Sequence, residues 1–297
     1  MTPDVSVLMP AFNAESTLGQ QLEALSRQDV PFEWELLVCD NGSTDATARV
    51  ASEWQGRLPL TVVDASSRRG PAAARNRGAQ LASAPLLLFC DADDVVADDW
   101  MLELHRALQG ADLVAGGRRY ARLNAQPHGP ADWEQPLFTK PAPLLPLPAA
   151  TTSNLGVRAV VFSAVGGFDE SLRAAEDIDF CWRVQLAGYR LIAQPNAVVH
   201  IRRRSTLPAV FRQAFGYGVG DRVLLRKFAG EASGAQPAAA IEAQPEAQPQ
   251  QEAQSSIEVQ PRPGRVRRML GRRSIDLRYL ADRLGRRLGR TFGGWST

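Results

Sequence analysis

The feature that most constrains the fold is an alternation of short apolar segments with helical segments near the start of the chain. Apolar runs at 5–9, 35–39, 60–63 and 86–90 predict buried strands. Segments with helical signals lie between them, among them an alanine-rich stretch at 71–83. Strands that alternate with helices favour a parallel, doubly wound α/β sheet, because each helix carries the chain back to start the next strand in the same direction.

Polar residues follow three of these strands, at the edge where such sheets bind their ligands. They are PAFN at 10–13, Asp40, and DADD at 91–94. Asn13 and the turn that starts at Asp40 are candidates for capping the helices that follow them. Carboxylates at the end of a buried strand suit a hard divalent cation, although acidic residues there more often cap helices or face solvent. This spacing alone leaves both interpretations open.

The middle of the chain carries weaker signals. Residues 120–150 are rich in proline and lack regular periodicity, which predicts a long crossing loop. Residues 151–228 regain strand and helix patterns, with a helix expected at 175–187 and a strand at 197–200. We therefore expect 151–228 to complete the domain that the first strands begin.

The C-terminal part differs from the rest in composition. Residues 230–264 consist mainly of alanine, glutamine, glutamate and proline without an aromatic residue, which is typical of a disordered linker. Residues 265–297 place leucines at helical spacing among arginines, although glycines weaken the predicted helix. The expected organisation is one folded domain at 1–229, the linker, and a basic amphipathic tail.

Composition excludes several classes of protein. A chain of 297 residues with 44% hydrophobic and 22% charged residues is ordinary for a folded domain. Cys39, Cys90 and Cys181 are too widely spaced to indicate a disulfide framework or a zinc module, which favours a reducing compartment. The N-terminus lacks the basic leader and long apolar run of a signal peptide, and no apolar stretch is long enough to span a membrane. We therefore expect a cytoplasmic protein.

Four blocks of residues resemble, in order and spacing, the family 2 glycosyltransferases. The resemblance covers residues 4–200 and leaves the tail and the 120–150 loop outside. In the second block Asn41 replaces the commoner second aspartate of the family pattern. The blocks are VSVLMPAFN at 5–13, LVCDNGSTD at 37–45, GPAAARNRG at 70–78 with LFCDADD at 88–94, and GGFDE at 166–170 with EDIDFCWR at 176–183.

This resemblance implies a GT-A fold, a Rossmann-like mixed sheet flanked by helices. It also implies transfer of a sugar from a nucleotide-diphosphate donor to an acceptor hydroxyl, with inversion at the anomeric carbon. Asp93 and His200 would hold Mn²⁺ or Mg²⁺ beside the leaving diphosphate, near the basic run at 202–204. The residues that it assigns to the nucleotide sugar are Pro10, Ala11, Asn13, Glu15, Asp40, Arg75 and Asp91.

Asp177 matches the position of the family's general base. An ionised carboxylate within reach of the acceptor hydroxyl could take its proton as that oxygen attacks the sugar. The resemblance also places Asp169 and Glu176 on the acceptor side. The structural alternative is that acidic residues in a first helical turn only complement the helix dipole. Trp182, on an apolar face of the same helix, is expected to be a core residue.

The tail combines charge with an apolar face. Residues 262–297 hold eleven arginines against two aspartates, a local charge of +9. Nucleic-acid arms need the charge but not a regular apolar stripe, whereas a helix at a membrane surface needs both. We therefore expect the tail to contact an anionic membrane surface rather than nucleic acid, with a glycan or lipid-linked acceptor on the cytoplasmic face.

Two other functions are compatible with parts of the sequence. A nucleotidyltransferase also places a carboxylate-bound metal beside a nucleotide, but its glycine-rich activating loop is missing near the N-terminus. A non-catalytic binder of nucleotide sugars would keep the fold without the chemistry. The presence of Asp91, Asp93 and Asp177 argues against the second alternative.

Overall fold

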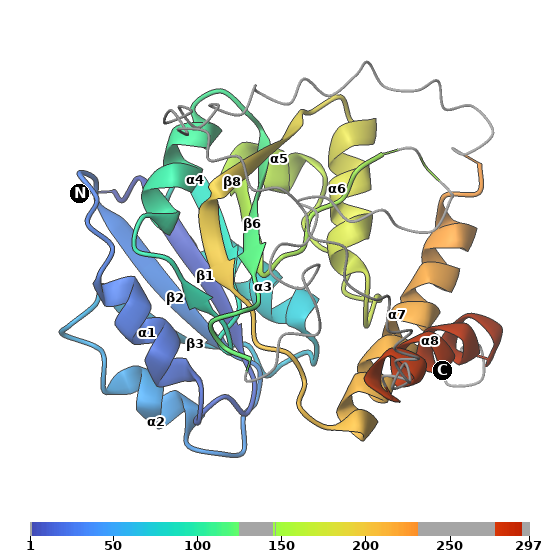
Figure 1. Cartoon of the computed structure of the whole chain (residues 1–297). Coiled ribbons are helices and arrows are strands. Elements are labelled where there is room, and N and C mark those ends of the chain that lie inside the picture. Colours follow the sequence, from blue (N-terminus) through green and yellow to red (C-terminus); the bar gives the residue numbers. More distant parts are fainter. Residues whose placement is uncertain (1, 125–144, 146, 231–276, 293–297) are drawn as a thin grey trace, which may run out of the picture.

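The computed structural model describes residues 2–124, 145, 147–230 and 277–292, and the predicted alternation forms a layered α/β structure (Figure 1). In chain order the described elements are β1 (Val5–Ala11), α1 (Leu18–Ser26), β2 (Trp34–Asp40), α2 (Thr47–Ser52), β3 (Leu60–Asp64), α3 (Pro71–Leu81), β4 (Leu86–Cys90), β5 (Val95–Val96), α4 (Trp100–Leu108), β6 (Leu113–Arg119), β7 (Asn154–Arg158), α5 (Ala159–Ala164), α6 (Glu176–Leu186), β8 (Leu191–His200), α7 (Leu207–Lys227) and α8 (Leu277–Phe292).

The eight described strands form one sheet in the order β3-β2-β1-β4-β7-β6-β8-β5. The first four strands run parallel, as the alternation predicts. β7 is antiparallel to both β4 and β6, and β5 is antiparallel to β8. The sheet is therefore mixed, and a purely parallel sheet is correct only for its N-terminal half.

Two groups of helices cover the two faces of the sheet, because successive strand residues point to opposite sides. Val7 and Met9 of β1 pack into one core with leucines of α1 and α4, whereas Leu8 joins a second core with α3, α5 and α6. All five residues of β4 are buried, as expected for a strand covered on both faces. Trp182 of α6 is buried, which confirms that it is a core residue.

The helix starts differ from the expected caps. α1 begins only at Leu18, and Asn13 has a left-handed φ of 49°. The Asn13 side-chain oxygen instead accepts a hydrogen bond from the Thr44 backbone N–H at 2.8 Å. Asp40 accepts hydrogen bonds from the backbone N–H and hydroxyl of Ser43, so it closes a turn rather than capping α2. The predicted cap at Asn13 is wrong, because this side chain links the end of β1 to the turn after β2. In the turn that starts at Asp40, the last residue, Asp45, accepts a hydrogen bond at 3.0 Å from the backbone N–H of Thr47, the first residue of α2.

A pair of hydrogen bonds joins α3 to the loop that precedes α6. The Asn76 side-chain amide donates to the Phe168 carbonyl and accepts from the Phe168 N–H, both at 2.9 Å. Gly167 has a φ of 68°, and a Cβ there would lie 2.8 Å from the Asn76 oxygen. Only glycine suits both the conformation and the close approach. These contacts fix where the chain enters α6.

Helices α7 and α8 pack directly against each other beside the sheet (Figure 1). A Cβ at Gly218 would lie 2.2 Å from the Arg286 carbonyl oxygen, and one at Gly289 would lie 2.2 Å from that of Phe215. The Arg290 guanidinium donates two hydrogen bonds, at 2.9 and 2.6 Å, to a carboxylate oxygen of the buried Asp221. The glycines, which on sequence grounds weaken a helix, therefore permit close contact between two helices.

Some predictions lie outside the described residues. These are the linker, most of the 120–150 loop, and the start and end of the tail. Within the described part of the tail, α8 confirms the predicted helix. Among the described helices, none combines the length and apolar character that a membrane crossing requires.

Candidate active site

A cavity of about 1060 Å³ opens at the edge of the sheet where β1 and β4 end. Its wall continues through the segment before α6 and along one face of α7. This is the position in which open α/β sheets bind ligands. The predicted site residues that line the cavity are Pro10, Ala11, Asn13, Arg75, Asp91, Asp93, Glu176 and Asp177.

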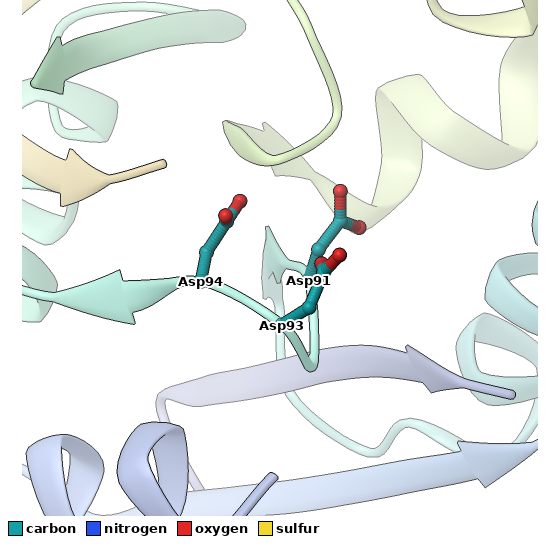
Figure 2. Close-up of side chains that lie close together, drawn as sticks. All are labelled: Asp91, Asp93 and Asp94. Atoms are coloured by element: carbon teal, nitrogen blue, oxygen red, sulfur yellow. The ribbon is translucent and has the colours of Figure 1, made fainter. Parts of the chain in front are cut away.

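Three carboxylates gather on the turn between β4 and β5. Ligand oxygens of Asp91, Asp93 and Asp94 all lie within 4.8 Å of one another, and Figure 2 shows the three side chains pointing to the same side of the turn. Burial and the charge of Asp91 raise the pKa of Asp93 above its usual range. Burial and the charges of Asp91 and Asp93 likewise raise the pKa of Asp94.

This mutual repulsion bears on metal binding. A divalent cation among the carboxylates would relieve the repulsion, and three carboxylate oxygens match the ligands that Mg²⁺ and Mn²⁺ prefer. The residues therefore fit a hard metal ion. Asp94 also accepts a hydrogen bond from the Arg202 backbone N–H at 2.8 Å, which holds the turn against the end of β8. Arg204 lies 3.4 Å from Asp93.

Arg75 is buried between two carboxylates. Its guanidinium lies 2.6 Å from an Asp91 oxygen and 3.1 Å from a Glu176 oxygen. Its exposed fraction is only 3%, so in this structure it is engaged by the protein itself. Arg75 connects α3, the end of β4 and the start of α6 in one ionic network. Its observed partners differ from the base or diphosphate contact that the resemblance assigns to it.

Asp177 lies in the first turn of α6, where the Ile178 backbone N–H donates to its carboxylate at 2.8 Å. Burial and the neighbouring charge of Glu176 raise its pKa from the ordinary 3.8 to about 7. A carboxylate with a pKa near neutrality can accept a proton and release it again at physiological pH. Tyr217 of α7 lies on the same cavity, where burial and the charge of Asp177 raise the pKa of its hydroxyl to about 12.

Sequence comparison identifies the family. The model of "Glycosyl transferase family 2" matches residues 6–161, and that of "Glycosyl transferase family group 2" matches residues 86–239. The first match spans more than half of the chain. The chain belongs to glycosyltransferase family 2.

Curated relatives of the glycosyltransferase include enzymes from several organisms. Glycosyltransferase AglE of Haloferax volcanii is 31% identical over 239 residues, which cover 76% of this chain and 77% of the relative. The pre-mycofactocin glycosyltransferase of Mycobacterium tuberculosis is 32% identical over 232 residues, which cover 72% of this chain and 46% of the relative. The chain thus spans about half the length of the mycobacterial relative.

Solved structures show that the fold is GT-A. The mannosyltransferase PcManGT of Pyrobaculum calidifontis, in complex with GDP-Man and Mn²⁺, matches with a TM-score of 0.60 and 22% identity over 76% of this chain and 65% of that protein. S. aureus TarS 1–349, in complex with UDP-GlcNAc, matches with a TM-score of 0.55 and 20% identity over 77% of this chain and 74% of that protein.

Four residues that the sequence assigns to the site of this glycosyltransferase do not line the cavity. They are Glu15, Asp40, Asp169 and His200. Asp40 closes its own turn, and Glu15 accepts a hydrogen bond from the Ala46 N–H at 2.7 Å. Burial acts to raise the pKa of Asp169, but hydrogen bonds from Lys227 and Ser171 lower it to about 2. In this structure the carboxylates of Glu15, Asp40 and Asp169 therefore stabilise turns and helix contacts around the cavity.

His200 is the last residue of β8 and does not join the acidic cluster. Val199 is fully buried in the core, and strand alternation directs His200 to the opposite face. The third member of the cluster, beside Asp91 and Asp93, is Asp94 rather than His200. The DADD sequence contains this signal, but the carboxylates of adjacent residues converge only because the chain turns sharply between β4 and β5.

The sequence also did not predict the cavity wall formed by α7. Arg212, Gln213, Gly216 and Tyr217 of this helix line the cavity, together with Arg173 ahead of α6. The recognisable blocks end before α7, so no motif indicates these residues. Asn41, the departure from the family pattern, has a structural role: its amide donates to the Ala65 and Arg68 carbonyls at 2.6 and 2.8 Å. An aspartate has no N–H to make these bonds.

Proposed function

We propose that this glycosyltransferase moves a sugar from a nucleotide-diphosphate donor to an acceptor hydroxyl with inversion, in a reaction that depends on Mn²⁺ or Mg²⁺. The observation that carries the proposal is that the acidic cluster at 91–94 and Asp177 line one cavity. The two functions that the reaction needs, a cation site and a proton acceptor, thus lie on the same cavity. The ligands bound in the structural neighbours, UDP-GlcNAc and GDP-Man with Mn²⁺, support a donor of this class.

In this mechanism each wall of the cavity has its own task. Pro10, Ala11 and Asn13 contact the nucleotide at the end of β1. One oxygen of Asp91 pairs with Arg75, and the other accepts hydrogen bonds from the ribose hydroxyls. Asp93 and Asp94 would hold the cation. When bound, the cation neutralises charge that builds on the leaving diphosphate.

Asp177 is the base in this proposal. It takes the proton of the acceptor hydroxyl as that oxygen attacks the anomeric carbon from the side opposite the diphosphate, which produces inversion. Glu176 keeps its contact with Arg75 and supplies the negative charge that helps to raise the pKa of Asp177. Arg204, which lies 3.4 Å from Asp93, is placed to contact the departing diphosphate.

Donor binding and hydrolysis test the proposal. UDP and GDP sugars are screened for thermal stabilisation with Mn²⁺ and again with EDTA, and the rate of donor hydrolysis is then measured for the best one. Asp93→Asn should lower Mn²⁺-dependent hydrolysis at least a hundredfold, whereas the matched control Asp98→Asn, on an exposed side chain, should not. Absence of stabilisation by every nucleotide sugar would contradict the proposal. The anomeric configuration of a transfer product, observed by proton NMR, tests inversion.

We also propose that α8 contacts an anionic membrane surface on the cytoplasmic face, which brings the cavity to a glycan or lipid-linked acceptor. Leu280 and Leu284 are 45% and 53% exposed, and the exposed Arg283 and Arg287 lie along the same stripe of the helix. Exposed leucines beside arginines suit the boundary between acyl chains and anionic headgroups.

Vesicle sedimentation tests this contact. Changing Leu280 and Leu284 together to Gln removes apolar area without opening the core, because both are exposed. We expect binding to anionic vesicles to fall at least tenfold. Leu81→Gln, at a similarly exposed leucine of α3, is the matched control and should bind as the parent does. Equal sedimentation of the double variant and the parent would contradict a membrane role for α8.

A further inference from the structure

Two arginines on the cavity wall have no protein partner among the described residues. Seven arginines line the cavity. Arg75 and Arg204 form ion pairs with the acidic cluster, and the Arg202 guanidinium donates hydrogen bonds to the Asp93 backbone carbonyl and the Gln20 side chain. Arg173 and Arg212 are exposed and form neither an ion pair nor a hydrogen bond with any described residue. Their charges are therefore available to a ligand.

These two arginines belong to the same wall as the proposed base. Arg173 lies four positions before Asp177 in the bend ahead of α6, and Arg212 lies one turn ahead of Gly216 on the cavity face of α7. α7 contacts the segment before α6 directly, since a Cβ at Gly220 would lie 2.7 Å from the Ala174 carbonyl oxygen. Ala175 next to it adopts a left-handed φ of 65°. The close packing at Gly220 thus joins α7 to the segment that carries Arg173 and Asp177.

The chemistry of this wall differs from that of the donor side. Arg204 already lies at the acidic cluster, where a donor diphosphate would be neutralised. Arg173 and Arg212 instead line the part of the cavity formed by the segment before α6 and by α7, where Tyr217 feels the charge of Asp177. Guanidinium groups bind phosphate oxygens in paired, charge-assisted hydrogen bonds, which favours phosphate over a neutral glycan as their ligand.

We infer that Arg173 and Arg212 form an acceptor-side subsite for a phosphate group, so that the acceptor is a phosphate-linked rather than a neutral molecule. The inference rests on the proposed function and deepens it. It agrees with the position of α8, whose exposed leucines lie on the helix that packs against α7. A lipid-linked phosphate would bring its chain toward those leucines and its charge toward the two arginines.

Ligand binding with the donor side occupied tests the subsite. The protein is saturated with Mn²⁺ and whichever of UDP or GDP stabilises it more, and calorimetry then measures the affinity for octyl phosphate, inorganic phosphate and octyl glucoside. The variant carries Arg173→Gln and Arg212→Gln together. The matched control is Arg226→Gln, an exposed arginine on α7 that does not line the cavity.

We expect the parent to bind octyl phosphate at least tenfold more tightly than octyl glucoside, and the double variant to lose that preference. Tighter binding of octyl phosphate than of inorganic phosphate would identify a lipid-linked phosphate. Equal affinities for octyl phosphate and inorganic phosphate would show that the subsite recognises the phosphate group alone. Either result supports the subsite. A parent without preference for octyl phosphate, or a double variant that keeps it, would overturn the inference.

Nucleotide binding separates this inference from the proposed function. If the double variant loses affinity for the nucleoside diphosphate itself, the two arginines belong to the donor side and the inference is wrong, while the proposed function stands. If no nucleoside diphosphate or nucleotide sugar stabilises the parent, the proposed function has failed instead. The two failures therefore give different results in the same experiment.

Discussion

The raised pKa of Asp177 predicts how the rate should depend on pH. As the proposed base, Asp177 must be ionised to accept a proton, and its pKa of about 7 lies well above the ordinary 3.8. Turnover should therefore rise with pH through neutrality, with about one tenth of the plateau rate at pH 6 and about half at pH 7. An unperturbed aspartate would already give the plateau at both values.

Changing Glu176 to Gln should shift the acid limb of this profile, the range in which the rate rises with pH, to lower pH. The substitution removes the negative charge that, after burial, does most to raise the pKa of Asp177. It also leaves the Arg75 charge less neutralised, and that charge acts in the same direction. A shift of about one pH unit, equivalent to roughly 1.4 kcal/mol, is the expected size for one nearby charge. At pH 6 the variant should then run about fivefold faster relative to its own plateau than the parent does.

The assay is the initial rate of nucleotide-sugar hydrolysis between pH 5 and 9, with water as acceptor and with donor and Mn²⁺ saturating at each pH. Glu176→Asp keeps the charge and is the matched control, so its acid limb should stay near pH 7. Melting temperatures identify any variant that fails to fold. An acid limb that remains at pH 7 in Glu176→Gln would refute the assignment of this titration to Asp177.

Three further changes test other parts of the structure. Asp177→Asn should raise the melting temperature more at pH 8 than at pH 5. A carboxyl whose folded-state pKa is raised from 3.8 to about 7 lowers stability increasingly as pH rises between these two values, and the full loss is present only above pH 7; an equal rise at both pH values would contradict this. Asn41→Asp should cost about 2–3 kcal/mol of folding free energy in urea denaturation, since it removes two buried hydrogen-bond donors and faces two carbonyls with a carboxylate. Gly289→Leu should expose α8 to limited proteolysis, since its Cβ would lie 2.2 Å from the Phe215 carbonyl oxygen. The control Gly230→Leu, where a Cβ meets no atom within 4 Å, should remain as resistant as the parent. Equal resistance of both variants would contradict the close contact between α7 and α8.

The N-terminal half of the fold could be predicted from the sequence because its signals are local. The apolar runs that form β1, β2, β3 and β4 also determine where the polar residues emerge, so the position of Asp91 and Asp93 at the cavity follows from the pattern. The direction of β7 could not be predicted in the same way. A proline-rich stretch without periodicity precedes it, and that stretch contains no crossover helix signal to indicate a parallel or an antiparallel return.

The contacts of the site depend on residues far apart in the chain. Arg75 and Glu176 are 101 positions apart, and nothing local to either residue predicts their ion pair. Glycine in α8 is a second example, because helix propensity describes an isolated helix and takes no account of a neighbour. At Gly285 the neighbour is decisive, since a Cβ there would lie 2.7 Å from the Phe211 carbonyl oxygen.

The ionic bridge from Asp91 through Arg75 to Glu176 has a consequence for the order of substrate binding. In the proposed mechanism, a donor that draws the Asp91 carboxylate toward its ribose would weaken the ion pair between Asp91 and Arg75. The Arg75 charge would then act more strongly on Glu176. The electrostatic environment of the proposed base would therefore depend on whether the donor is bound. Thermodynamic reciprocity requires the converse, so an acceptor that changes the ionisation of Asp177 must alter donor affinity by the same factor. If Asp91 and Asp177 act as proposed, one buried guanidinium would couple the binding of the two substrates.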